Sequence, residues 1–166
     1  MSKQSTRIIH GTMMRVANIG VLMIGSSCYG KSETALHLIS RGHKLISDDA
    51  VQLQHHHNTI IASAPHPMCQ KIHLRDIGLI DTSDHFTEKR IIENACLELV
   101  IELCDQHQRP DNSLRPKIHD IEYLGVQLPL ICFSMKTYCP PAIKLETLVK
   151  QFKLSTLTRK LTQPDL

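Results

Sequence analysis

A glycine-bounded loop constrains this chain more than any other feature. Residues 25–32 read Gly-Ser-Ser-Cys-Tyr-Gly-Lys-Ser and fit the pattern G-x-x-x-x-G-K-[ST] without a gap. In this pattern backbone N–H groups surround phosphate oxygens, the lysine reaches the outer phosphates, and the hydroxyl coordinates Mg²⁺. The pattern therefore predicts a nucleotide site formed by Gly25, Ser26, Ser27, Cys28, Tyr29, Gly30, Lys31 and Ser32.

The segments on both sides of the loop support this interpretation. Residues 20–24 form a short apolar run, and residues 32–41 place Ala35, Leu38 and Ile39 at helical spacing before a glycine. A loop between a strand and a helix N-terminus favours an anion, because unpaired N–H groups and the helix dipole point toward it. A turn that only connects strand to helix is the alternative.

Length and composition indicate one domain with an aliphatic core. The 166 residues include no Trp, 3 Phe and 3 Tyr, so Ile, Leu, Val and Met must fill the interior. A chain of this length is typical of a single domain. We expect that domain to span residues 7–154, with flexible termini at 1–6 and 155–166.

Charge and cysteine usage exclude several classes of protein. The net charge of +3 comes from scattered basic residues, which gives no reason to expect a nucleic-acid partner. The 6 cysteines form no C-x-x-C pair, which favours reduced thiols in a cytoplasmic protein over disulfides or zinc. No run approaches the roughly 18 apolar residues of a membrane span, and we expect no membrane partner.

Hairpins dominate the predicted strands. An opening hairpin is expected from residues 7–10 and 13–17, and another from residues 51–54 and 59–62, with the histidines 55–57 at its turn. Three histidines also suggest a metal site, but three consecutive side chains cannot all face one centre. The solvated turn is therefore the favoured interpretation.

The second half of the chain continues in the same way. Residues 97–103 favour a strand, residues 105–116 an exposed loop, residues 121–124 and 128–133 a β pair, and residues 142–154 a final helix. Doubly wound nucleotide folds alternate strand and helix throughout, which this chain does not. We expect an α/β domain with a mixed, largely antiparallel sheet, one helix after the loop and one at the C-terminus.

Two aspartates follow the strand predicted over residues 43–47. Phosphoryl transfer needs a metal ligand and a group that takes the proton of the acceptor, and Asp48 and Asp49 suit both tasks. Because neighbouring strand residues point to opposite faces, one aspartate should face the phosphates while the other orients its surroundings. A plain turn at the strand end is the alternative.

Several segments together resemble a known family. They are His10-Gly11, the loop with its continuation Glu33-Thr34-Ala35-Leu36, then Arg41-Gly42-His43 and Asp48-Asp49-Ala50-Val51. This set resembles the catalytic domain of bacterial HPr kinase/phosphorylase, strongly over residues 7–54 and recognisably to about residue 81. By itself, His10 is more typical of an ordinary surface or core histidine.

The resemblance implies a P-loop domain like that of phosphoenolpyruvate carboxykinase. It implies ATP and Mg²⁺ as cofactors, and the phosphocarrier HPr and inorganic phosphate as partners. Members of the family phosphorylate a serine of HPr, reverse the reaction by phosphorolysis, and assemble as homo-hexamers. This chain resembles short members without an N-terminal domain.

The resemblance also assigns roles to individual residues. Asp49 would accept the proton in phosphorylation and donate it in the reverse reaction, and Lys31 would bind the transferred phosphate. Ser32 would coordinate Mg²⁺, with Asp48 as the expected second ligand, and His10 would lie near the aspartates.

A family signature close to E-I-R-G-L-G-I aligns with residues 73–79 and places Arg75 in the site. The chain departs from the signature here: His73 replaces a Mg²⁺-binding glutamate and Asp76 replaces a glycine. We hypothesise that Asp76 supplies the missing charge, because imidazole is a poor ligand for Mg²⁺. Arg115 is the counterpart of a later family arginine. The segment 128–134 lacks the basic loop tied to dephosphorylation, so phosphorolysis is less expected than phosphorylation.

Two other functions compete with a protein serine kinase. One is a nucleotide- or phosphate-sensing module with little catalysis, suggested by His73 and Asp76. The other is a small-molecule kinase that uses the same loop, although the chain lacks the alternating helices that form the lid of those enzymes.

Overall fold

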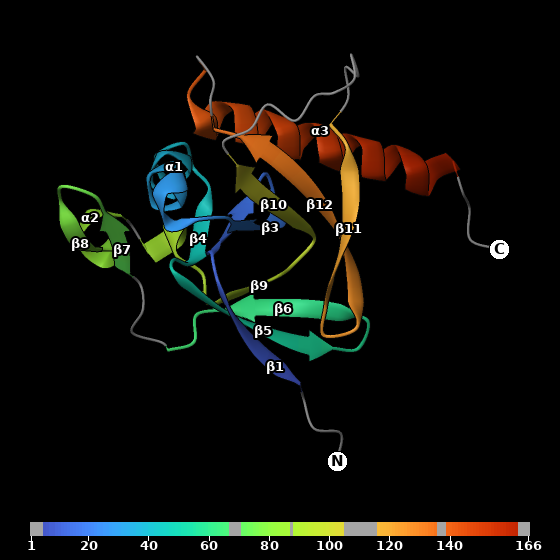
Figure 1. Cartoon of the computed structure of the whole chain (residues 1–166), viewed down its shortest axis with the longest axis horizontal. Helices are drawn as coiled ribbons and strands as arrows, with labels where there is room; N and C mark the ends of the chain where they lie inside the picture. Colours follow the sequence, from blue (N-terminus) through green and yellow to red (C-terminus); the bar gives the residue numbers. More distant parts are fainter. Residues whose placement is uncertain (1–4, 67–70, 87, 105–115, 136–138, 163–166) are drawn as a thin grey trace.

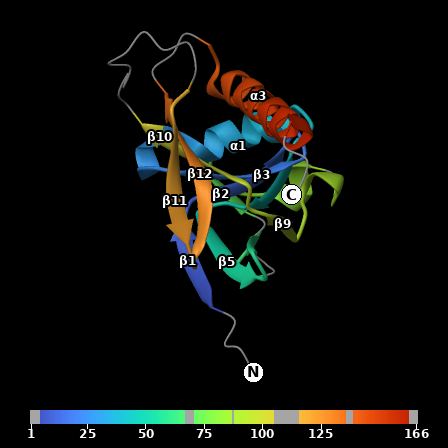
Figure 2. The ribbon, with the colours of Figure 1, turned by 90° about the vertical axis from the view of Figure 1, so that its right-hand side faces the viewer.

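The strands form three sheets, and the long helices cover one of them (Figures 1 and 2). The computed structural model describes residues 5–66, 71–86, 88–104, 116–135 and 139–162, with the side chains of all except 28, 88 and 159–162. The six-stranded sheet contains, in spatial order, β11 (Ile118–Tyr123), β12 (Val126–Ser134), β10 (Leu99–Cys104), β3 (Ile19–Ile24), β2 (Thr12–Val16) and β4 (Lys44–Ser47). The four-stranded sheet contains β1 (Thr6–His10), β5 (Ala50–His56), β6 (Thr59–Ser63) and β9 (Asn94–Cys96), and a small sheet contains β7 (Lys71–Leu74) and β8 (Gly78–Asp81).

The helices lie mainly on one side of the six-stranded sheet. They are α1 (Lys31–Ser40), the short α2 (Thr82–His85) and α3 (Pro141–Thr162), with 3₁₀ turns η1 (Ser27–Tyr29) and η2 (Glu88–Arg90). Figure 1 shows α1 and α3 above this sheet, the strands β1, β5 and β6 below it, and β7–β8 beside α1. Within the described residues no helix is long and apolar enough to cross a membrane.

The six-stranded sheet is buried on both faces and separates two apolar cores. Alternation along β3 sends Val21 and Met23 toward the helices and Leu22 toward the four-stranded sheet, and all three side chains are fully buried. Strands covered on both faces read as continuous apolar runs, as β3 and β10 do here. The predicted aliphatic interior is therefore present as two layers rather than one.

Strand pairing confirms the predicted fold class. β3 pairs in parallel with β10, and β10 with β12, whereas the other described pairs in the three sheets are antiparallel. The strands divide among three sheets, whereas the sequence suggested a single one. The parallel strands end on the side of the nucleotide loop, the edge where α/β proteins bind ligands.

The opening hairpin predicted from residues 7–10 and 13–17 is wrong. β1 pairs with β5 in one sheet, while β2 pairs with β3 and β4 in another. The chain crosses between the sheets at Gly11, where an added Cβ would lie 2.7 Å from the carbonyl oxygen of Met23. The true hairpin joins β2 to β3 through Ala17 and Asn18, whose φ values of 50° and 67° suit a tight two-residue turn.

The later hairpins form as predicted, but of the histidines 55–57 expected at a turn only His57 lies in it. β5 and β6 pair around a turn at His57 and Asn58, with His55 and His56 in the strand, and β11 and β12 pair around Gly125. The strand predicted over 97–103 is β10, preceded by β9. Most of the loop predicted over 105–116 lies outside the described residues.

The final helix is longer than predicted. α3 runs from Pro141 to Thr162, past the expected end at residue 154. Leu145 and Val149 pack against the core, whereas Leu154 and Leu157 are exposed. Apolar periodicity marks only the packed part of such a helix, because turns that do not pack on the core need no apolar side chains.

Candidate active site

The nucleotide loop connects the end of β3 to the start of α1. Its first glycine, Gly25, has φ 128°, and an added Cβ there would lie 2.5 Å from the carbonyl oxygen of Leu103. Its second, Gly30, adopts a left-handed conformation with φ 68° as the N-cap of α1. The close contact at Gly25 excludes a side chain there, and the left-handed φ of Gly30 favours glycine. The first N–H groups of α1 have no acceptor inside the helix and lie next to the loop.

Lys31 is the first residue of α1 and its side chain folds back over the loop. The side chain is buried, and Nζ donates hydrogen bonds to the carbonyl oxygens of Gly25 at 2.7 Å and Ser26 at 3.0 Å. The ammonium group is thereby fixed at the loop, where it adds positive charge to the dipole of α1.

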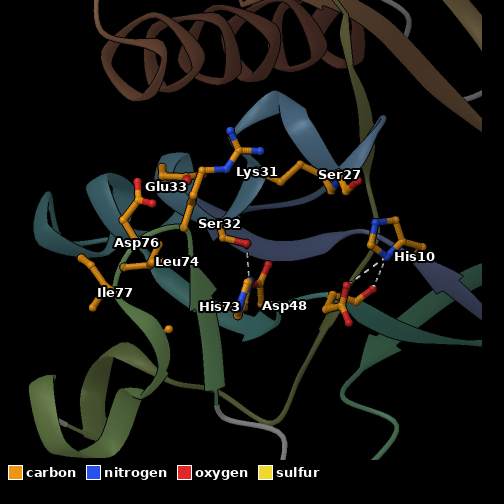
Figure 3. Close-up of a pocket in the computed structure, with 14 residues that line it drawn as sticks. His10, Ser27, Lys31, Ser32, Glu33, Asp48, His73, Leu74, Asp76 and Ile77 are labelled. Carbon is orange, nitrogen blue, oxygen red and sulfur yellow. Dashed lines mark hydrogen bonds and ion pairs between the residues drawn. The ribbon is translucent and has the colours of Figure 1, made fainter.

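Asp48 lies at the centre of a chain of hydroxyl groups. Its Oδ2 accepts a hydrogen bond of 2.8 Å from Ser32 Oγ, and its Oδ1 accepts one of 2.6 Å from Thr12 Oγ1. Asp48 is 6% exposed and Thr12 is fully buried. The carboxylate is thus held rigidly beside the hydroxyl of the loop (Figure 3).

Asp49 faces a different group from Asp48. Its φ of 69° marks a sharp turn after β4, and its exposed side chain meets His10, whose Nδ1 lies 3.1 Å from Oδ1 and 2.9 Å from the carbonyl oxygen of Asp49. A carbonyl oxygen only accepts, so Nδ1 of His10 carries the proton in this contact. The N–H group of Gly11 donates to the same carbonyl oxygen at 3.1 Å.

One cavity of about 650 Å³ unites most of these groups. Figure 3 shows His10 on one side, Asp76 and Ile77 on the other, and Ser32 with Asp48 between them. The size lies within the range of small-molecule sites. The predicted site residues that line it are His10, Ser27, Gly30, Lys31, Ser32, Asp48, Asp49 and Arg75. Of the other predicted loop residues, Gly25, Ser26 and Tyr29 do not line it, and the side chain of Cys28 lies outside the described part of the structure.

The turn between β7 and β8 closes one side of the cavity. Its exposed residues Arg75, Asp76 and Ile77 line the cavity, together with His73 from β7. Asp76 has φ 67°, at the position that the resemblance aligns with a glycine. Aspartate tolerates this left-handed conformation better than most residues, which explains how the turn is kept without glycine. Arg115 lies outside the described residues.

Some lining and supporting residues were missed by sequence reasoning. Glu33 and Ile77 line the cavity, and Thr12 contacts Asp48 without lining it. The sequence held one signal for Thr12. It stands directly before the apolar pair Met13-Met14, which indicates burial, and a buried hydroxyl needs a hydrogen-bond partner. Nothing in the sequence indicated that this partner would be Asp48.

Ser32 and Asp48 fit a Mg²⁺ ion bound together with nucleotide. Mg²⁺ prefers oxygen ligands, and it commonly takes one or two protein groups while water and substrate phosphates complete its shell. The described residues contain no group of three or more His, Cys, Asp or Glu side chains able to hold a metal alone. The oxygens of Ser32 and Asp48 therefore suit a cation that binds together with the nucleotide phosphates better than a permanently bound ion.

Known proteins resemble this chain in both sequence and fold. A solved structure described as the HPr(Ser) kinase/phosphatase from Coxiella burnetii matches with a TM-score of 0.83 and 30% identity, covering 90% of this chain and 98% of that one. The HPr kinase/phosphorylase of Caldicellulosiruptor bescii is 38% identical over 130 residues, covering 76% of this chain and 42% of the relative. That of Clostridium botulinum is 30% identical over 154 residues, covering 91% and 50%.

The family assignment extends over nearly the whole sequence. The chain spans about half the length of the curated relatives it matches. The model of the HPr Serine kinase C-terminal domain matches residues 2–163, so it includes the loop, both aspartates, the β7–β8 turn and α3. This chain belongs to the HPr serine kinase C-terminal domain family.

Proposed function

We propose that this domain transfers the γ-phosphoryl group of ATP to a serine hydroxyl of HPr or a related phosphocarrier, with Mg²⁺ bound at Ser32 and Asp48. The observation that carries the proposal is one cavity that holds Lys31, the Ser32–Asp48 pair and the His10–Asp49 pair. The structural match to an HPr(Ser) kinase/phosphatase over 98% of that chain supports HPr as the acceptor.

The residues divide the work of phosphoryl transfer among them. The N–H groups at the start of α1 and the ammonium group of Lys31 bind and orient the phosphates. Asp49 accepts the proton of the serine hydroxyl while the new bond to phosphorus forms and the bond to the bridging oxygen of ADP breaks. A bound Mg²⁺ ion supplies charge neutralisation at the phosphates.

The exposure of Asp49 supports a protein acceptor. Its side chain is 79% exposed and that of its partner His10 is 53% exposed, so the proposed base stands at the mouth of the cavity. A serine on the surface of a folded protein can reach such a position. A kinase for a small metabolite normally encloses its acceptor to exclude water.

The names of the relatives also suggest the reverse reaction. In phosphorolysis, inorganic phosphate would attack the seryl phosphate to form pyrophosphate, and protonated Asp49 would return its proton to the serine oxygen. We propose phosphorolysis as a second activity of the same cavity.

We also propose that the protein works in the cytoplasm and that it assembles as a homo-oligomer. Sedimentation velocity on the purified chain tests the expected hexamer.

Intact-mass spectrometry of HPr tests the main proposal. Purified chain, HPr, ATP and Mg²⁺ are mixed, and we expect HPr to gain one phosphoryl group on serine. The Asp49→Asn variant should lose transfer, whereas Asp120→Asn, at an exposed aspartate of β11, should match the wild type. Unmodified HPr at high enzyme concentration, together with normal nucleotide binding, would instead favour the sensing module.

The same samples separate the remaining possibilities. Adding inorganic phosphate to purified seryl-phosphorylated HPr should release pyrophosphate if phosphorolysis is present. Phosphorylation of a metabolite in a small-molecule extract, without modification of HPr, would favour the small-molecule kinase and contradict the proposal.

A further inference from the structure

We propose that Thr12 is a positioning residue for the reaction, whose hydroxyl fixes the carboxylate of Asp48 in the orientation that receives a divalent cation. Thr12 acts through Asp48 and does not itself touch the nucleotide or the cation. This inference rests on the proposed function, because it concerns the cation site at Ser32 and Asp48.

The geometry around Asp48 leaves its carboxylate little freedom. Thr12 Oγ1 donates to Oδ1 at 2.6 Å and Ser32 Oγ donates to Oδ2 at 2.8 Å, so each carboxylate oxygen has its own hydroxyl. The terminal torsion of aspartate is broad, and one hydrogen bond would leave the plane of the carboxylate free to turn. The two bonds together define that plane.

The residue type at position 12 points to the hydrogen bond rather than to packing. Thr12 is fully buried at the start of β2, next to the fully buried Met13. Valine has nearly the same shape and would fill this position without the cost of burying a hydroxyl. The hydroxyl therefore serves its contact with Asp48, which is the partner that removes this cost.

The backbone of the same segment is also held against the aspartates. His10 Nδ1 and the N–H group of Gly11 both donate to the carbonyl oxygen of Asp49. Gly11 is packed so closely against β3 that a Cβ would meet Met23 O at 2.7 Å. The three consecutive residues 10–12 thus contact both aspartates from a restrained backbone, which holds Thr12 within hydrogen-bond distance of Asp48.

The carboxylate keeps capacity for a cation after these two bonds. An ionised carboxylate has about four lone-pair sites, and the hydroxyls of Thr12 and Ser32 use two of them. Groups that hydrogen-bond to a metal-ligating carboxylate set its orientation, and their loss typically weakens metal affinity by roughly 10–100-fold. Thr12 has this relation to Asp48.

Mn²⁺ titration of the ADP-bound chain, followed by electron paramagnetic resonance, tests the proposal without any turnover. Thr12→Val should weaken Mn²⁺ binding by roughly 10–100-fold. Thr12→Ser, which restores the hydroxyl, should bind Mn²⁺ about as tightly as the wild type. Thr147→Val, at an exposed threonine of α3, is the matched control and should leave binding unchanged. Affinity for ADP without metal should be the same in all four proteins.

A double-mutant cycle shows whether Thr12 acts through Asp48. In an Asp48→Asn background, Thr12→Val should have little further effect on Mn²⁺ affinity, because the carboxylate that Thr12 orients is gone. Thr12→Cys, which replaces a strong donor by a weak one, should give an intermediate affinity and serves if the valine variant does not fold.

Two results would overturn the inference at different levels. A wild-type chain that binds no Mn²⁺ with ADP would remove the cation site, and with it both the proposed function and the role of Thr12. A wild-type chain that binds Mn²⁺ tightly, with folded Thr12→Val and Thr12→Cys variants that bind it equally well, would leave the site in place and refute the role of Thr12 alone.

Discussion

Ser32 Oγ donates a hydrogen bond of 2.8 Å to Oδ2 of Asp48, across a sequence separation of 16 residues. The bond joins the first turn of α1 to the end of β4. It places a loop hydroxyl and a strand-end carboxylate where P-loop proteins hold the cation that accompanies their nucleotide.

Replacing Asp48 by Asn should remove the metal dependence of nucleotide binding. The amide has nearly the shape of the carboxylate but no charge, so the fold should persist while the proposed cation loses its acidic ligand. We expect Mg²⁺ to enhance ATP affinity in the wild type and to have about tenfold less effect in the variant. Isothermal titration with and without Mg²⁺ measures this, with Asp120→Asn as control. Equal enhancement in both proteins would assign the cation to other groups.

Replacing Asp49 by Asn should stop transfer and spare nucleotide binding. Asparagine tolerates the left-handed conformation that Asp49 adopts with φ 69°, so the turn should be kept. Loss of a positioned general base typically costs 10²–10⁴-fold, and we expect the rate of HPr phosphorylation to fall by roughly that factor. Affinity for ATP should change little, because the Asp49 side chain is exposed at the cavity mouth. Near-normal transfer would mean that another group takes the serine proton.

The parts of this site that the sequence predicted are local in the chain. The loop is one unbroken run whose glycines, lysine and serine have roles set by the turn they form. Asp48 and Asp49 were placed by the end of a strand. They do meet different partners, but the cause is the left-handed turn at Asp49 beyond β4, with φ 69°, rather than the strand alternation that the sequence suggested. These inferences need no knowledge of which strands pair.

What the sequence did not predict depends on contacts between distant segments. β1 pairs with β5 rather than β2, and short strands with similar apolar patterns do not specify such a choice. The contact of Thr12 with Asp48 follows from another long-range pairing, that of β2 with β4, whose register sets Met13 opposite Ser47 and so brings Thr12 to the end of β4. The length of α3 was underestimated because the apolar side chains of its later turns that the structure describes, Leu154 and Leu157, are exposed and continue no apolar stripe.

Gly25→Ala should destabilise the protein and weaken nucleotide binding together. A methyl group at this position would lie 2.5 Å from the carbonyl oxygen of Leu103, and the φ of 128° is strained for any side chain. We expect a loss of about 3 kcal/mol in the free energy of unfolding. Gly125→Ala is the matched control, because its φ is also positive but no atom lies within 4 Å, so its cost should be about 1 kcal/mol. Urea denaturation of both variants makes the comparison, and equal losses would contradict the close contact at the loop.

A second cluster of charges, remote from the cavity, ties α3 to the end of α1. The side chain of Glu146 is 8% exposed and accepts hydrogen bonds from Lys150 and Arg41. Nε2 of His43 lies 3.6 Å from Oε1 of Glu146. The hydrogen bond from Lys150, followed by that from Arg41, lowers the pKa of Glu146 to about 2, against the opposing effect of burial. Burial lowers the pKa of His43, which accepts a hydrogen bond at Nδ1 from the backbone of Ala17.

Acid should therefore weaken the docking of α3 in two steps. The unfolded chain protonates His43 near its ordinary pKa of 6.5 and Glu146 near 4.5, whereas the folded chain resists both until lower pH. Because the unfolded state binds more protons in these windows, the free energy of unfolding should decline below about pH 6.5 and again from about pH 4.5 toward 2. Glu146→Gln should lower the free energy of unfolding by about 1–2 kcal/mol at neutral pH and make the second decline shallower. The control Glu93→Gln, at an exposed site, should leave the neutral-pH stability and both declines unchanged. Urea denaturation across this pH range measures the slopes, and a second decline that is equally steep in Glu146→Gln would assign the acid sensitivity to other groups.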